Sequence, residues 1–392
     1  NVAIGYAAAN GFDTESHNLA IGTDALGGSV AGGEHNVAIG NFSLDALTSG
    51  DGNTAVGKYT GSAITTGENN VFLGRNANIN GTTGDENVII GKDAVGLGVL
   101  TGNENVVIGM GAGYDMTSAT ASVFVGDNSG ANVTTGSRNV ALGKNAIKQP
   151  DTESDNLGIG YNALEGAIAG GEYNVAIGNY ALDALTSADN NVALGYQAGG
   201  ALTTGGTNVL IGALAASAGT MTGADNVIIG YQSGKNMSSG HDSVFVGENA
   251  GRNMNTGSNN VVVGKDAGVD MTDDTDNVVI GYRAGNALTD SSNVIIGSDA
   301  ARVGTTHTEN VIIGYSAAGS GNLTGDSNVI IGKAAGQLMT SGPHNVLIGK
   351  QAGAKITEGD KNVIVGSQAG AELTGDGGDF NTLIGYAAGN AL

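Results

Sequence analysis

Several residue types that usually stabilise or diversify a domain are absent or rare in this chain. Its 392 residues include no Cys, no Trp and only 2 Pro, and aromatic residues make up 4%. The absence of Cys excludes a disulfide framework and thiol-dependent chemistry. No apolar run reaches the roughly 18 residues of a membrane span, so the sequence predicts no membrane insertion.

Positive charge is also scarce. The chain has 15 Lys and Arg against 37 Asp and Glu, which gives a formal net charge of −22 at pH 7. Nucleic-acid binding is disfavoured, because a phosphate backbone requires a basic surface. The negative charge favours solubility and repulsion between neighbouring particles.

Glycine and repetition are what the chain has in abundance. It contains 70 Gly, and the opening "NVAIGYAAANG" returns as "NVAIGNFSLDALTSG" at residue 36 and "NVAIGNYALDALTSA" at residue 174. Counted from the Asn, 23 copies follow one another at spacings of 16 to 19 residues, usually 17. The sequence predicts one continuous array over residues 1–392, cut from a longer repeat protein because it begins and ends within the repeat.

Two columns of the repeat hardly vary. Position 1 is Asn in 21 copies, and position 5 is Gly in all 23. A short Val/Ile-rich run that ends in Gly predicts a short strand and a turn with positive φ. We expect a structural turn column at Gly5, Gly22, Gly40, Gly57, Gly91, Gly178, Gly230 and Gly314. We expect a ladder of side-chain amides at Asn18, Asn36, Asn87, Asn174, Asn226 and Asn310.

The repeat length limits the fold class. Seventeen residues are too few for a βαβ unit, and no helical periodicity is present. Each copy reads as two short strands and two turns, the second strand lying at position 12, as at Leu47, Ile64, Leu202 and Met271. The sequence therefore predicts an all-β parallel β-solenoid (β-roll) of about 23 coils, stacked about 4.8 Å apart.

Position 3 is apolar although it lies between the apolar positions 2 and 4. We expect positions 2 and 4 to fill the coil and position 3 to face a neighbouring chain. The inter-chain residues would include Phe72, Ile89, Val107, Phe124, Ile228, Phe245, Ile295 and Ile312. The alternative is a wider single-chain solenoid with an apolar surface stripe.

Segments such as "NVIIGYQSG" and "TTGENNVFLG" carry a family resemblance. The chain resembles the β-roll heads of trimeric autotransporter adhesins, and still more the repeat arrays of trimeric phage tail-fibre-like proteins. The resemblance implies a homotrimer, an extended fibre and an attachment role, outside the cell on a cell surface or a virion.

Three functions remain open at this stage. The chain is a rigid trimeric spacer, or its lateral surface binds glycan or host matrix, or, as a minor alternative based on its recurring "TTG", it binds ice. The second function would use the Tyr column at position 6, although these rings equally suit a shielding role. The column includes Tyr161, Tyr196, Tyr231, Tyr282 and Tyr315.

No complete catalytic motif occurs, so we expect no enzyme and no cofactor. The nearest match, "GNTAVGKY", ends in Tyr59 where a phosphate-binding loop requires Ser or Thr. Acidic loops are candidates for Ca²⁺ but read more readily as solvated turns. They comprise Asp273, Asp274 and Asp276 in one loop and Asp376 and Asp379 in another.

Overall fold

The computed structural model describes residues 1–11, 15–29, 32–149, 152–166, 169–303, 308–374 and 379–390. The chain forms two compact units, Asn1–Gln197 and Ala198–Leu392. Over the described ranges the fold is all-β and contains no helix. Accordingly, none of those residues forms a helix that is long and apolar enough to cross a membrane.

Among the residues that the structure describes, the first unit contains twelve strands of three residues each, one in every copy of the repeat. They are β1 (Val2–Ile4), β2 (Leu19–Ile21), β3 (Val37–Ile39), β4 (Thr54–Val56), β5 (Val71–Leu73), β6 (Val88–Ile90), β7 (Val106–Ile108), β8 (Val123–Val125), β9 (Val140–Leu142), β10 (Leu157–Ile159), β11 (Val175–Ile177) and β12 (Val192–Leu194).

Over its described ranges, the second unit contains eleven strands of the same length. They are β13 (Val209–Ile211), β14 (Val227–Ile229), β15 (Val244–Val246), β16 (Val261–Val263), β17 (Val278–Ile280), β18 (Val294–Ile296), β19 (Val311–Ile313), β20 (Val329–Ile331), β21 (Val346–Ile348), β22 (Val363–Val365) and β23 (Thr382–Ile384).

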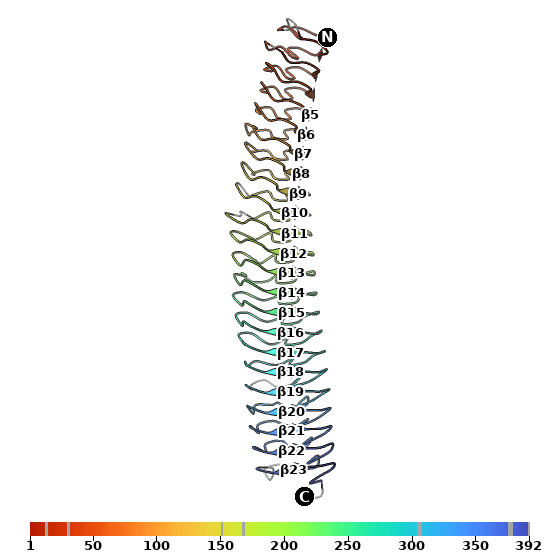
Figure 1. Cartoon of the computed structure of the whole chain (residues 1–392), viewed down its shortest axis with the longest axis vertical. Coiled ribbons are helices and arrows are strands. Elements are labelled where there is room, and N and C mark those ends of the chain that lie inside the picture. The colour runs from red at the N-terminus through yellow and green to blue at the C-terminus, as the bar shows by residue number, and fades with distance from the viewer. Residues whose placement is uncertain are drawn as a thin grey trace. The chain divides into compact units, whose positions relative to one another are not determined.

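Within each unit, every strand pairs in parallel with the strands of the preceding and following copies. The register places equal repeat positions opposite each other, so that Ile89 of β6 pairs with Val107 of β7, and Ile228 of β14 pairs with Phe245 of β15. Figure 1 shows the strands of each unit following one another on the same side of successive coils. This arrangement confirms the predicted parallel β-solenoid, with one copy of the repeat per coil.

The predicted second strand at position 12 is wrong. Over the described residues, only an isolated bridge between Leu202 and Met221 forms there. The path from position 6 to the next Asn is instead a series of turns. The residues at positions 7 and 9 and the residue just before the next Asn adopt left-handed backbone conformations. In the coil of β9 these residues are Asn145, Ile147 and Asp155, with φ of 57°, 46° and 61°.

The prediction that position 3 faces another chain is also wrong. All eight predicted residues, Phe72, Ile89, Val107, Phe124, Ile228, Phe245, Ile295 and Ile312, are 0% exposed within the single chain. Successive side chains on a strand point to opposite faces, and the middle residue of each three-residue strand points into its own coil. The flanking positions 2 and 4 point outward and are only partly covered.

The core of each coil lies between the middle residue of the strand and the turn path opposite it. Position 8 is buried where the coils stack, as at Ala94 and Ala250, which confirms the crowded corner expected from its small residues. Position 12 is buried as well, as at Leu47 and Ile64, although it forms no strand. The coil interior is therefore filled entirely by its own chain.

Candidate functional site

The Gly column is structural, as predicted. Its eight predicted members have φ between 135° and 142°. A Cβ on Gly91 would lie 2.3 Å from the carbonyl oxygen of Gly109 in the next coil, and a Cβ on Gly230 would lie 2.3 Å from that of Gly247. Only Gly permits this conformation and this close stacking of coils.

The amide ladder is also confirmed. The backbone N–H of Asn87 donates to Oδ1 of Asn70 at 2.9 Å, and the Asn87 side-chain amide donates to the carbonyl of Gly102 at 3.0 Å. The six predicted Asn residues are at most 2% exposed. At Ser122 the hydroxyl substitutes for one of these contacts, since it accepts the N–H of Asn139 at 3.3 Å. The ladder therefore joins coils and offers no surface for chemistry.

The outward face of the strands is an apolar stripe in each unit, which we call the strand stripe. It consists of positions 2 and 4 of β2–β12 in the first unit and of β13–β22 in the second. Every residue in these ranges is Val, Ile or Leu except Thr54. Most are partly exposed, and Leu73, Leu194 and Val363 reach 40%, 44% and 38% exposure. A contiguous apolar face of this kind is typical of an interaction surface.

The Tyr column is exposed, but its rings already have neighbours. Tyr161 and Tyr196 both contact Tyr180 edge to face, with ring centroids 5.3 and 6.2 Å apart. The Arg283 guanidinium lies 4.6 Å from the ring centroid of Tyr282, and the Lys333 ammonium lies 5.5 Å from that of Tyr315. Tyr231 is half exposed. These contacts suit a shielding role.

The acidic loop at residues 273–276 uses its carboxylates within the fold. Asp273 accepts the hydroxyl of Thr256 at 2.6 Å, Asp274 accepts the N–H of Thr272 at 2.9 Å, and Asp276 accepts the amide of Asn259 at 3.1 Å. These three acceptors serve three different neighbours. Over the described ranges, no three His, Asp or Glu side chains come close enough together to hold a metal ion.

In the second predicted acidic loop, Asp379 accepts the N–H of Asp360 at 3.0 Å. Asp376 lies outside the described residues. The Asp379 contact is one of several in which a side chain two residues before the ladder Asn accepts an N–H from the preceding coil. Asp51, for example, accepts the N–H of Glu34 at 2.7 Å. Acidic residues at this position therefore join neighbouring coils.

The Thr residues of the recurring "TTG" are also engaged along the stack. The hydroxyl of Thr65 donates to the carbonyl of Thr82 at 3.2 Å, and the hydroxyl of Thr203 donates to the carbonyl of Met221 at 2.9 Å. The first Thr of each pair therefore serves cohesion between coils.

Two Asp residues at position 10 have perturbed acidity. Burial raises the pKa of Asp183 to about 6, and the nearby Glu165 carboxylate adds to the shift. Burial likewise raises the pKa of Asp45, with Asp24 as a smaller cause. These groups are half buried, and each faces another acidic side chain, so they affect stability at neutral pH.

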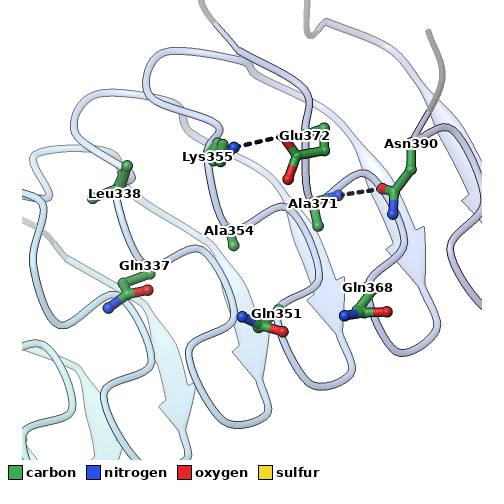
Figure 2. Close-up of a pocket in the computed structure, with 9 residues that line it drawn as sticks. All are labelled: Gln337, Leu338, Gln351, Ala354, Lys355, Gln368, Ala371, Glu372 and Asn390. Carbon is green, nitrogen blue, oxygen red and sulfur yellow. Dashed lines mark hydrogen bonds and ion pairs between the residues drawn. The ribbon is translucent and has the colours of Figure 1, made fainter.

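A groove that the sequence did not reveal lies on the loop side of the second unit, across the coils of β20–β23. It encloses about 330 Å³. Figure 2 shows Gln351 and Gln368 in one row and Leu338, Lys355 and Glu372 in a second, with Gln337, Ala354 and Ala371 between them. The Gln spacing of 17 residues, from 351 to 368, is visible in the sequence, but the curvature of the coil is not.

A comparison with descriptions of known protein families found no match, and neither did a comparison with curated protein sequences.

Proposed function

We propose that this chain is a shaft segment of a homotrimeric attachment fibre outside the cell, on a cell surface or a virion, where it acts as a rigid spacer without enzymatic activity. The observation that carries the proposal is the strand stripe. It remains partly exposed after the coil has filled its own interior, so it requires a partner.

A second copy of the same chain suits this stripe better than an unrelated partner. The stripe repeats once per coil, about every 4.8 Å, over many successive coils. A partner must match that period along its whole length, and another copy does so by construction. Cyclic association of identical chains also closes the apolar faces around one axis. The resemblance to trimeric fibre repeats favours three chains.

The distribution of charge supports the same arrangement. None of the residues at positions 2 and 4 is charged, although the chain carries a net charge of −22. The charges lie in the strand-to-strand loops, where they would point away from a common axis. Chains that meet along their strand stripes therefore bury no charge and avoid its desolvation penalty.

Native mass spectrometry of the full chain tests the assembly. We expect the mass of three chains at micromolar concentration. Replacing Ile90, Ile108 and Val125 together by Glu should give a monomer, because all three lie at position 4 of successive strands. Its circular dichroism should remain that of a β-solenoid, because these side chains do not fill the coil.

A matched triple variant provides the control. Leu97, Val99 and Met110 are apolar residues outside the strands and are 60%, 49% and 52% exposed. Replacing them by Glu should leave the trimer intact. A wild-type chain that stays monomeric at micromolar concentration would rule out the proposed fibre.

A further inference from the structure

We propose that the groove across the coils of β20–β23 binds a neutral oligosaccharide chain that lies along the coil stack. This inference goes beyond the spacer role, because it assigns a ligand to the shaft itself. The volume of about 330 Å³ lies at the lower end of the range for small-molecule sites, roughly 300–1,000 Å³.

The first wall of the groove presents free carboxamides. Gln351 and Gln368 occupy the same repeat position, and their backbone N–H groups donate to the carbonyls of Lys333 and Lys350 at 2.9 and 2.7 Å. The backbone is thus fixed by the stack. Among the described residues, neither side-chain amide has a hydrogen-bond partner. Each therefore offers a carbonyl acceptor and an NH₂ donor, which is the combination that a sugar hydroxyl can use in both directions.

The floor and the second wall favour a neutral ligand. Ala354 and Ala371 form a small apolar floor between the two walls, which suits the C–H face of a sugar ring (Figure 2). On the second wall the Lys355 ammonium and the Glu372 carboxylate form an ion pair at 2.5 Å. Their charges cancel, so the groove does not select an anion or a cation. Both side chains remain about half exposed and can still contact hydroxyl groups.

The repeat distance distinguishes a glycan from a peptide. Successive coils place equivalent side chains about 4.8 Å apart, which is close to the length of one pyranose unit in an extended chain, whereas an extended peptide advances about 3.3–3.4 Å per residue. The backbone N–H groups of Ala354 and Ala371 on the floor of the groove are also already bonded. The N–H of Ala371 donates to Oδ1 of Asn390 at 2.9 Å. A peptide would find no free sheet edge there to extend.

The groove stays accessible in the proposed fibre. It is lined by repeat positions 7, 10 and 11, whereas the strand stripe uses positions 2 and 4. Its function therefore does not depend on whether the chain is a monomer or a trimer. The failure of either proposal would leave the other standing.

The test is a glycan array that carries neutral glucans, galactans and N-acetylhexosamine polymers beside sialylated and sulfated glycans, probed with the full chain. We expect binding to at least one neutral linear glycan. The affinity for that glycan is then measured by calorimetry for the double variant Gln351→Ala/Gln368→Ala. Loss of two bidentate amides should weaken binding at least about tenfold.

The matched control is Gln197→Ala/Gln232→Ala, which removes two amides at the same repeat position outside the groove. It should bind like the wild type. No binding to any neutral glycan, equal weakening by both double variants, or unchanged binding by the groove variant would overturn the proposal. Binding only to charged glycans would do so as well.

Discussion

Two regions of the molecule fill the interior of the coil from opposite sides. In the coils of β9–β11, which we call the small-strand region, the middle strand residue is Ala141, Gly158 or Ala176, and the buried residue at position 9 is large. In the coils of β14–β17, the large-strand region, the middle strand residue is large and position 9 is Gly. The large residues at position 9 of the first region are Ile147, Leu164 and Leu182, and the pairs of the second are Ile228 with Gly234, Phe245 with Gly251, Val262 with Gly268 and Val279 with Gly285.

The exchange shows that the coil interior conserves volume and not residue identity. In the large-strand region a Cβ on Gly251 would lie 3.2 Å from the ring of Phe245, so the ring already occupies that space. In the small-strand region a Cβ on Gly158 would lie 2.7 Å from Ile147, which has filled the space from the other wall. Close-packed interiors tolerate such swaps when the total volume is kept.

A large residue at position 9, as in the small-strand region, has a conformational cost. Leu164 has a φ of 52°. The left-handed conformation costs a non-Gly residue about 1–2 kcal/mol. Full burial of a Leu side chain contributes about 1.5–3 kcal/mol, so burial outweighs the strain by a small margin. Gly at this position in the large-strand region avoids the strain and leaves the volume to the strand residue.

The largest expected effect is one that both regions share. Replacing Gly160 in the small-strand region or Gly247 in the large-strand region by Ala would place a Cβ within 2.7 or 2.6 Å of the next coil's backbone. We expect each variant to lose about 4 kcal/mol locally, from backbone strain and displaced packing together. Hydrogen exchange measured by mass spectrometry should show equal loss of protection in the two regions.

Gly385 separates the two causes of that loss. It has a φ of 127°, and a Cβ there would meet no atom within 4 Å. The Gly385→Ala variant should therefore show the conformational cost alone, about 1–3 kcal/mol. If Gly160→Ala and Gly247→Ala cost no more than Gly385→Ala, close coil stacking is not what requires Gly in this column.

The second prediction converts one region into the other. Phe245→Ala alone should destabilise its coil by about 3–5 kcal/mol, because it leaves a cavity. Gly251→Leu alone should be destabilising through overcrowding and strain. The double variant reproduces the Ala176/Leu182 type of coil and should recover about 2 kcal/mol relative to the sum of the single variants. Additive effects in urea unfolding would refute volume exchange between the two walls.

The repeat itself allowed much of this fold to be predicted. The invariant Gly and the nearly invariant, buried Asn make the same contacts in almost every coil, so their columns indicated the turn and the ladder directly. The inward face of the strand was predicted wrongly because positions 2, 3 and 4 are all apolar. The alternation of apolar and polar residues that usually tells the inward face from the outward face is therefore missing. The informative feature was the size of the residue at position 3. Position 3 ranges from Gly158 to Phe245, and in β9–β11 and β14–β17 a small residue there accompanies a large one at position 9 or the reverse, whereas position 4 stays Ile, Val or Leu.

The second strand and the groove could not be predicted for a different reason. Both depend on the path of the turns, which is set by left-handed residues of many types. These include Asn145, Ile147 and Gln351. Most of these residue types do not indicate a left-handed backbone conformation when only the sequence is considered. The groove further requires that Ala354 and Ala371 come between two rows of longer side chains, which only the coil path determines.

The smallest expected effect again separates the two regions and concerns pH. Burial raises the pKa of Asp183, at position 10 of the β11 coil, from its usual 3.8 to about 6, and Glu165 adds to the shift. Position 10 is not acidic in the large-strand region, where it holds Lys235, Arg252, Val269 and Asn286. Burial also raises the pKa of Asp274 in the coil of β16, so the Asp183→Asn variant is needed to isolate the response of the small-strand region.

The sign follows from the direction of the shift. Because the folded state binds this proton more tightly than the unfolded state, the associated stability is fully present below pH 3.8 and is lost as the pH rises through about 6. The side chain is only half buried, so solvent screening limits the loss to about 1 kcal/mol. Hydrogen exchange at pH 5 and pH 7.5, corrected for intrinsic rates, should show the β11 coil better protected at pH 5. Asp183→Asn should abolish this difference and leave β14–β17 unchanged, whereas a difference that persists in the Asn variant would assign the pH response to another group.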